Sequence, residues 1–292
     1  MLFLLTTALA GDGPWTLNPG DVNLYVGTSH YRYDDYDIAG QSAGSIAGDG
    51  TVGSQSVLVA TAGLLPGVEA EMRVPWESVR VTDVKAGACG ENEGLCRPSK
   101  GLGDVEGYLK VRVLDEFYTA PLSVGVSLGA RSGEAYANQR GRLTALGDGQ
   151  TAVGGQLSVG RTASVGNGWY AASATGGYWY RLGSSGGTPL SNEVAGAVDV
   201  TWSPKGRVGI GPTAYGFHRL GGQDLDDIDF NNADCFAVLA ASQVQVGGRL
   251  SVYANTTTVH ISAMKTVWGR NNPTDTLALS AGVGRYLPVR ER

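Results

Sequence analysis

The sequence is short of several features on which large classes of protein depend. Charged residues make up 17% of the 292 residues, and the 22 Lys and Arg residues form no cluster. Because a nucleic-acid-binding surface needs such a cluster to neutralise phosphates, we expect no nucleic-acid partner. No apolar run after the first residues reaches the roughly 20 residues of a membrane-spanning helix. No window of useful length shows the 3.6-residue periodicity of an amphipathic helix.

Histidine and cysteine are also rare, with three residues of each. Cys89 and Cys96 lie in the polar stretch CGENEGLC without a nearby histidine, which disfavours a metal site. We predict that this close pair forms a loop disulfide in an exported protein, with two unpaired thiols as the alternative. Cys235 is the remaining cysteine and takes no part in this predicted disulfide. Neither H-E-x-x-H nor a P-loop is present, and we expect no metal and no cofactor.

The first residues, MLFLLTTALAGDG, resemble an export signal. Leu2 to Leu9 form a short apolar core, and Ala8-Leu9-Ala10 fits the small-residue cleavage pattern. We therefore predict a signal peptide over residues 1–10 and one mature domain over residues 11–292. A buried N-terminal strand is the alternative for the first residues.

Glycine is abundant, with 45 residues, and so is a two-residue alternation. In GDVEGYLKVRV, residues 103–113, every charge falls on an even position and none on an odd one. VEAEMRVPWESVRV, PLSVGVSLGAR and TLALSAGVG alternate in the same way. This period is typical of β-strands whose two faces meet different surroundings.

About twelve such strands follow one another along the chain. Most are about 10 residues or longer, which exceeds the ~5–6 residues of a soluble strand and suits the roughly 9–11 residues of a tilted membrane-spanning strand. The predicted strands are 21–36, 52–63, 67–82, 102–115, 121–132, 150–162, 168–182, 192–203, 206–219, 234–245, 248–265 and 275–287.

The connections between these strands alternate in length. Short ones are GLLPG, DEFYTAP, ASVGN, SPKG and VGG, and long ones are 37–51, 83–101, 133–149, 183–191, 220–233 and 266–274. Outer-membrane barrels have short periplasmic turns and long external loops. We therefore predict an all-β fold for residues 11–292, a transmembrane antiparallel up-and-down β-barrel of about twelve strands in the bacterial outer membrane.

The two faces of the strands then have separate roles. Lys or Arg facing lipid near the midplane costs about 2–4 kcal/mol, so the uncharged face is expected outside and the ionic face inside. The predicted lipid-facing residues are Val105, Leu109, Val111, Leu122, Val124, Val126, Leu128, Leu277 and Leu279. The predicted lumen-lining residues are Glu69, Glu71, Arg73, Glu77, Asp104, Glu106, Lys110 and Arg112. If the third and fourth strands are neighbours, opposite charges meet at matched depth in a salt ladder; the solvent face of an ordinary sheet is the alternative.

Small residues are expected on the lumen face of other strands, where they would leave room for a solute. They are Ser123, Gly125, Ser127, Gly129, Gly154, Gln156, Ser158, Ser280 and Gly282.

Six segments follow one another in an order that resembles a known family: LLPGVEAEMRVPW, GLGDVEGYLKVRVL, PLSVGVSLGARSG, LGDGQTAVGGQLSVGR, WYAASATGGYWYR and WGRNNPTD. The series, from about Trp15 to Tyr286, resembles the outer-membrane transporter family associated with the meta-pathway of phenol degradation. That family is a distant relative of the long-chain fatty acid transporters. The resemblance implies a twelve-stranded barrel and passage of hydrophobic or aromatic compounds, without a well-defined substrate site.

The chain departs at both ends from the pattern of the transporters that it resembles. The segment from Gly11 to Gly20 is too short for the N-terminal hatch of the fatty acid transporters, so a hatch-gated mechanism is not expected. Outer-membrane barrels often finish on an aromatic residue, whereas Tyr286 is followed here by LPVRER.

Candidate catalytic motifs do not form a convincing site. Gly40 to Gly44 matches G-x-S-x-G, but it lies in a loop without the helix that a nucleophile elbow requires. Among the histidines, His30 near Asp34 and Asp35 is the only mild candidate for catalysis, and a satisfied or solvated histidine is the simpler interpretation. The acidic loop Asp224 to Asp234 fails the EF-hand spacing and is expected to be solvated, with adventitious calcium or lipopolysaccharide-bridging cations as the alternative. No catalytic residue is predicted.

Three functions remain after the sequence analysis. The first is an outer-membrane channel for small solutes by passive diffusion through a narrow polar lumen, with hydrophobic or aromatic solutes implied only by the resemblance. The second is a non-conducting structural or surface-interaction barrel, and the third is a membrane-embedded hydrolase. The expected partners are outer-membrane lipid, lipopolysaccharide and a small-molecule solute. The sequence does not indicate an oligomeric state.

Overall fold

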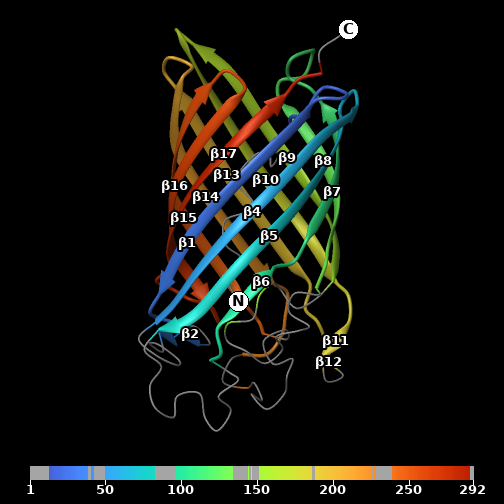
Figure 1. Cartoon of the computed structure of the whole chain (residues 1–292). Helices are drawn as coiled ribbons and strands as arrows, with labels where there is room; N and C mark the ends of the chain where they lie inside the picture. Colours follow the sequence, from blue (N-terminus) through green and yellow to red (C-terminus); the bar gives the residue numbers. More distant parts are fainter. Residues whose placement is uncertain are drawn as a thin grey trace.

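The computed structural model describes residues 13–38, 41–42, 50–82, 96–133, 144, 146, 151–185, 188–224, 227 and 239–289. Twelve antiparallel strands form one closed barrel, as predicted, and β4 closes the ring by pairing with both β1 and β5 (Figure 1). The barrel strands are β1 (Val22–Tyr33), β4 (Gly50–Leu65), β5 (Val68–Thr82), β7 (Glu106–Leu114), β8 (Ser123–Arg131), β9 (Ala152–Val165), β10 (Gly168–Arg181), β13 (Glu193–Ser203), β14 (Val208–Arg219), β15 (Ser242–Ala254), β16 (Thr257–Arg270) and β17 (Leu277–Leu287).

In the part of the chain that the structure describes, five shorter strands accompany the barrel. They are β2 (Asp37–Ile38), β3 (Gln41–Ser42), β6 (Ser99–Leu102), β11 (Ser184–Ser185) and β12 (Thr188–Pro189). β2 pairs with β3, and β11 pairs with β12, at the end of the barrel that carries the longer connections (Figure 1). Within the described residues no helix has the length and hydropathy needed to cross a membrane.

The predicted strand 102–115 is interrupted in the structure. β6 and β7 both pair with β5, and residues 103–105 between them lie outside either strand. The break is next to Pro75 of β5, which has no amide hydrogen to donate to a ladder. The Pro75 carbonyl still accepts a 2.9 Å hydrogen bond from the amide of Gly103. Asp104, in the middle of the break, is buried.

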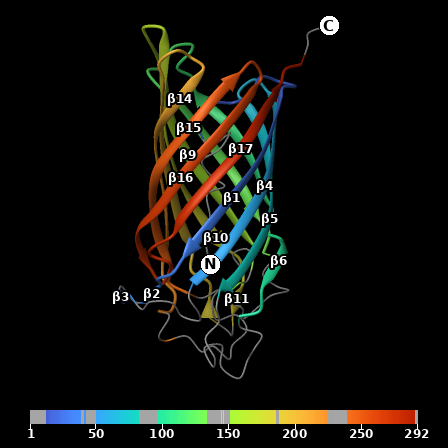
Figure 2. The ribbon, with the colours of Figure 1, turned by 60° about the vertical axis from the view of Figure 1, so that its left-hand side comes forward.

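Tight turns connect the strands at one end of the barrel, and longer connections lie at the other (Figure 2). Gly67, Gly166, Gly206 and Asn255 occupy these turns with positive φ angles, which glycine and asparagine adopt at little cost. Short turns face the periplasm in barrels of this kind, so the end with the longer connections is external.

The predicted turn at Val246-Gly247-Gly248 is wrong. β15 runs through these residues to Ala254, and the chain reverses at Asn255 and Thr256. The predicted strands 234–245 and 248–265 are therefore replaced by β15 and β16. Within β15, position 247 requires glycine because β16 passes very close to it. A Cβ there would lie 1.9 Å from the carbonyl oxygen of Ala263 on β16. Its role is close strand approach and not chain reversal.

The outer surface carries an apolar band. Among the predicted lipid-facing residues, six have side chains at least 41% exposed: Leu109, Val111, Val126, Leu128, Leu277 and Leu279. Val105, Leu122 and Val124 are only partly exposed. A closed barrel with a large apolar exterior is stable only in lipid, and the protein lies in the bacterial outer membrane.

The inner surface holds most of the buried polar side chains, and several glycines on it are covered by aromatic rings. A Cβ on Gly282 would lie 1.9 Å from the hydroxyl oxygen of Tyr25, and one on Gly154 would lie 2.6 Å from the Trp179 ring. Tyr25 and Trp179 are each only 1% exposed. The expectation that glycines such as Gly282 and Gly154 leave room for solute is therefore wrong, because the rings of Tyr25 and Trp179 occupy that room.

Candidate functional site

The lumen is the candidate site, and its first ion pair lies on β5 and β7. The two strands pair in the register that places Glu69 opposite Lys110. Oε1 of Glu69 lies 2.6 Å from Nζ of Lys110, and both side chains are less than a tenth exposed. A pair buried in this way is stable only when each partner is satisfied, so removal of either one is costly.

A second group of charges continues the wall toward the external end. Arg73 lies 2.6 Å from Glu71 on the same strand, and its guanidinium lies 5.0 Å from the centre of the Tyr108 ring. The Tyr108 hydroxyl donates to Glu106 at 2.7 Å, and Arg131 of β8 donates to the same carboxylate at 2.8 Å. The network therefore crosses from β5 through β7 to β8.

The network ends at the external mouth. Nη1 of Arg131 lies 3.8 Å from Oε1 of Glu193, and Nε of Arg219 lies 3.8 Å from Oε2 of the same residue. The Arg131 guanidinium also lies 4.8 Å from the centre of the Trp179 ring, which is edge-on to Tyr108. Charges on β5, β7, β8, β13 and β14 are thus joined along the wall.

Three of the predicted lumen residues lie outside the predicted ladder of charges between β5 and β7. Arg112 pairs at 2.9 Å with Asp115, three residues along its own chain segment. Glu77 accepts a 2.6 Å hydrogen bond from the side chain of Gln55 on β4. Asp104 is buried in the break between β6 and β7. The predicted ladder of opposite charges across β5 and β7 is therefore only one part of a wider network.

The opposite wall carries mostly neutral hydrogen-bonding groups. The His260 ring lies 2.8 Å from the hydroxyl of Ser251, and Gln243 donates to Thr266 at 3.0 Å. Arg249 and Asp199 form an ion pair there. The lumen thus has one strongly charged wall and one wall of hydroxyls, amides and aromatic rings.

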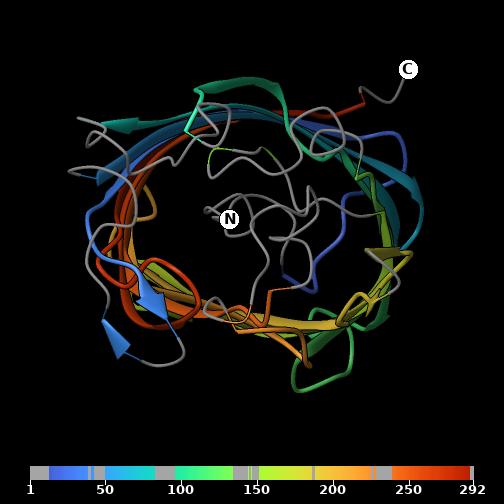
Figure 3. The ribbon, with the colours of Figure 1, turned by 90° about the horizontal axis from the view of Figure 1, so that it is seen from below.

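The segment ahead of β1 lies inside the barrel. Figure 3 shows the blue segment that leads to β1 within the ring of strands. Lys110 donates to the carbonyl of Gly13 at 3.0 Å, and the Trp15 indole donates to Glu116 at 3.0 Å. Glu116 also accepts hydrogen bonds from the amide and hydroxyl of Thr162 on β9, which fixes its position.

Two glycines on the wall make space for this segment. A Cβ on Gly125 would lie 3.2 Å from Cα of Pro14, and one on Gly160 would lie 3.0 Å from its ring. Further along, the amide of Gly20 donates to the carbonyl of Gly63 at 2.8 Å. The segment 13–20 is therefore seated on the wall by hydrogen bonds and close packing. Although it is too short for the hatch of the fatty acid transporters, it lies in the periplasmic half of the lumen, a position that its sequence did not predict.

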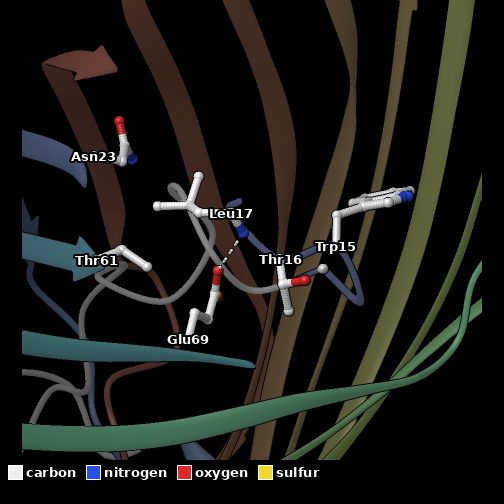
Figure 4. Close-up of a pocket in the computed structure, with 7 residues that line it drawn as sticks. Trp15, Thr16, Leu17, Asn23, Thr61 and Glu69 are labelled. Carbon is white, nitrogen blue, oxygen red and sulfur yellow. Dashed lines mark hydrogen bonds between the residues drawn. The ribbon is translucent and has the colours of Figure 1, made fainter. Parts of the chain in front are cut away.

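A cavity of about 210 Å³ remains between this segment and the wall (Figure 4). Trp15 and Leu17 form its apolar side, and Glu69, Thr61 and Asn23 form part of its polar side. Figure 4 shows the hydrogen bond from the amide of Leu17 to Glu69 at the edge of the cavity. The space is of the size that holds a single small ring.

The other candidates from the sequence do not assemble into a site among the described residues. His30 is exposed on the outer face of β1. Of the G-x-S-x-G motif, Gln41 and Ser42 lie in β3 and the rest is outside the described residues. The acidic loop is described only at Asp224 and Asp227, and Asp224 accepts hydrogen bonds from Asn271 and Arg270.

The export signal and the disulfide stay predictions. Residues 1–10 and Cys89 lie outside the described residues, as does Cys235, and Cys96 is buried.

Comparison with known proteins agrees with the barrel. The COG4313 outer membrane channel from Pseudomonas putida F1 superposes with a TM-score of 0.70 at 13% identity, over 96% of this chain and 100% of that one. The NanC porin, at 9% identity over 90% of this chain and 100% of its own, has a TM-score of 0.49, too low to support an argument. No family model matches the sequence, and no curated protein matches it. At these identities the likeness shows the fold alone, and the resemblance to the phenol-degradation family stays a prediction.

Proposed function

We propose that this chain is an outer-membrane channel through which small solutes diffuse passively, with the segment 13–20 as its constriction. One observation supports this most strongly: the closed barrel has a polar, charged inner wall, and a short chain segment lies against that wall from the periplasmic side. Twelve strands enclose more than a side-chain-filled eight-stranded barrel and less than a sixteen-stranded porin. A segment of this size therefore decides how wide the passage is.

The contacts of the segment suit a constriction more than a permanent plug. From Gly13 to Leu17 its hydrogen bonds run to side chains of the wall, and only at its end does the amide of Gly20 bond to a backbone carbonyl, that of Gly63. Polar side-chain contacts can exchange with water when the segment moves. The 210 Å³ cavity beside Trp15 and Leu17 leaves a space along the segment even when it is seated.

The class of solute rests on weaker support than the channel function does. The resemblance to the phenol-degradation transporters and the apolar faces of Trp15 and Leu17 favour small hydrophobic or aromatic solutes. The polar wall favours solutes that also carry a hydrogen-bonding group. We propose small, amphipathic molecules of about one ring as the substrates of the channel.

Planar-bilayer recording tests this function with the full mature chain and a variant that lacks residues 13–18. We expect the parent to show small conductance steps and the deletion variant to show larger ones, with faster entry of phenol into liposomes. If neither chain conducts ions nor admits phenol, the channel is excluded and the non-conducting structural barrel takes its place.

A further inference from the structure

The cavity beside the segment 13–20 has two sides that belong to different parts of the chain. The segment contributes one side and the barrel strands β1, β4 and β5 contribute the other (Figure 4). The residues that matter for its chemistry are Trp15, Thr16 and Leu17 on the segment and Asn23, Thr61 and Glu69 on the strands. The cavity is therefore complete only while the segment is seated on the wall.

Trp15 gives the cavity an aromatic surface in a fixed position. Its indole donates a 3.0 Å hydrogen bond to Glu116, and Glu116 is itself held by Thr162 of β9. The ring is also packed closely against Gly13, where a Cβ would lie 2.5 Å from two of its carbons. A solute ring can contact this surface without first ordering it, which lowers the entropic cost of binding.

Hydrogen-bond acceptors predominate on the polar side of the cavity. Glu69 is 2% exposed, and the amide of Leu17 and the ammonium of Lys110 each contact one of its oxygens. A carboxylate has about four lone-pair sites, so Glu69 can accept a further hydrogen bond. The Thr61 hydroxyl donates to Glu71 at 3.2 Å, which leaves its oxygen as an acceptor. A solute that donates a hydrogen bond therefore suits this side better than one that only accepts.

Thr16 supplies a polar group that the protein itself leaves unsatisfied. Its hydroxyl oxygen is buried, yet among the described residues it has no hydrogen-bond partner. A buried polar group without a partner destabilises a fold, and such groups are rare in native proteins. Because Thr16 lines the cavity, a hydroxyl on a bound solute can supply the missing partner.

The charges beside the cavity favour a solute without charge. Lys110 lies 2.6 Å from Glu69, so this ion pair is compensated within the wall. A solute carboxylate would lie beside Glu69, and a solute ammonium would compete with Lys110 for it. Either ion would also lose its hydration on entering the cavity. A neutral hydroxyl can donate to Glu69 and leave the ion pair intact.

We propose that this cavity binds neutral ring compounds that carry a hydrogen-bond donor, and that a bound solute holds the segment 13–20 in its seated position. A ligand that contacts both sides of the cavity binds the seated state alone and stabilises it by mass action. At high concentration the solute therefore narrows its own passage. This inference rests on the proposed channel and its constriction, and it names the chemistry of the solute.

Titration calorimetry on the full mature chain in detergent tests the binding site. The probes are p-cresol and anisole, which are isomers with one ring each, but only p-cresol donates a hydrogen bond. The variant that lacks residues 13–18 measures partition into the micelles, because it has lost one side of the cavity. We expect the parent to bind p-cresol at least about tenfold more tightly than anisole, since the donor reaches a charged acceptor. Equal affinities, or p-cresol binding retained by the deletion variant, would overturn the proposal.

Thr16→Val removes the unsatisfied hydroxyl and nearly keeps the shape of the side chain. We expect about fivefold weaker binding of p-cresol and unchanged binding of anisole, because one neutral hydrogen bond is lost. The variant should fold as the parent does, which circular dichroism checks. Thr28→Val, at an exposed position on the outer face of β1, makes the same exchange and should change neither affinity. If Thr16→Val bound p-cresol as tightly as the parent, the solute would not occupy this cavity.

Hydrogen exchange tests whether the solute holds the segment. With p-cresol at ten times its dissociation constant, the amides of residues 13–20 should exchange about tenfold more slowly, and anisole at the same concentration should have less effect. Unchanged exchange at saturating p-cresol would overturn the coupling.

Conductance separates this inference from the proposed function. A chain that conducts KCl but binds p-cresol no better than anisole is a channel without this site. A chain that binds p-cresol, with slower exchange in the segment, but never conducts retains the site and loses the channel.

Discussion

The backbone amide of Leu17 donates a 3.0 Å hydrogen bond to Oε2 of Glu69, a residue of the barrel wall. The other oxygen of that carboxylate lies 2.6 Å from Nζ of Lys110, which itself donates to the carbonyl of Gly13. One buried ion pair therefore forms hydrogen bonds with the segment 13–20 at two residues, Gly13 and Leu17. The position of the segment depends on groups that also stabilise the wall.

Replacing Leu17 with proline should loosen the segment, because proline has no amide hydrogen for Glu69. A hydrogen bond to a charged group contributes about 1.5–3 kcal/mol, so the seated state should lose at least about tenfold in population against the released state. We expect larger and noisier conductance steps in planar bilayers. Leu17→Ala keeps the amide and is the control. Identical records for the proline and alanine variants would contradict the assignment of the constriction.

Val126→Arg should impair the barrel by placing a charge in the lipid. Val126 is 41% exposed on the outer face of β8, and an arginine facing lipid costs about 2–4 kcal/mol near the midplane and less toward the interfaces. We expect a lower urea midpoint for folding into lipid vesicles. Val126→Leu at the same position should fold as the parent does. A tolerated arginine would mean that this face does not meet lipid.

Gly282→Ala should push the Tyr25 ring away from the wall. The new methyl would lie 1.9 Å from the Tyr25 hydroxyl oxygen, and overpacking of this kind costs about 1–3 kcal/mol. Because the ring can move only inward, we also expect a smaller conductance. Gly107→Ala is the control, since nothing lies within 4 Å of its added Cβ. Equal stability and conductance in the two variants would show that the glycine does not accommodate the ring.

Asp21 should make the periplasmic rim sensitive to acid. Its carboxylate accepts hydrogen bonds from the hydroxyl of Tyr286 and, at 2.9 Å, from the amide of Val289, so it ties the start of β1 to the end of β17. These bonds, the one from Tyr286 first, lower the pKa of Asp21 below its ordinary value. A lowered folded pKa means that the stabilisation is complete above the unfolded pKa of about 3.9 and is lost as the pH falls through the folded pKa.

In urea unfolding of the parent, the contribution of Asp21 to the free energy of unfolding should stay constant between pH 7 and pH 5. It should be lost below about pH 4. Asp21→Asn removes the titrating group, so its acid loss should be smaller. Asp275→Asn is the control because its ion pair with Lys265 is more than half exposed on both sides. If the stability of the parent and of Asp21→Asn fell in parallel with pH, the contacts of Asp21 with Tyr286 and Val289 would not be the source of the acid sensitivity.

The sequence alone predicted the barrel and most of its strands. Alternation between two faces is a local property, because each strand residue points opposite to its neighbour whatever the partner strand is. Leu109, Val111, Val126 and Leu128 could therefore be placed outside from their own segments. The turn at Asn255 was not predicted because the pair Gly247-Gly248 is the stronger local signal for a turn. Glycine is needed at position 247 for a different reason, the close approach of Ala263 on the next strand.

The contacts inside the lumen were decided by the tertiary structure. Arg131 and Glu193 meet although two strands, β9 and β10, separate them in the sheet, and no local pattern encodes that distance. The same holds for Pro14, which lies in a segment without periodicity and finds its place only against Gly125 and Gly160. Strand pattern determined which side chains face inward, because pleat geometry is local. Closure and tilt of the barrel determined which of them meet, because those depend on all twelve strands together.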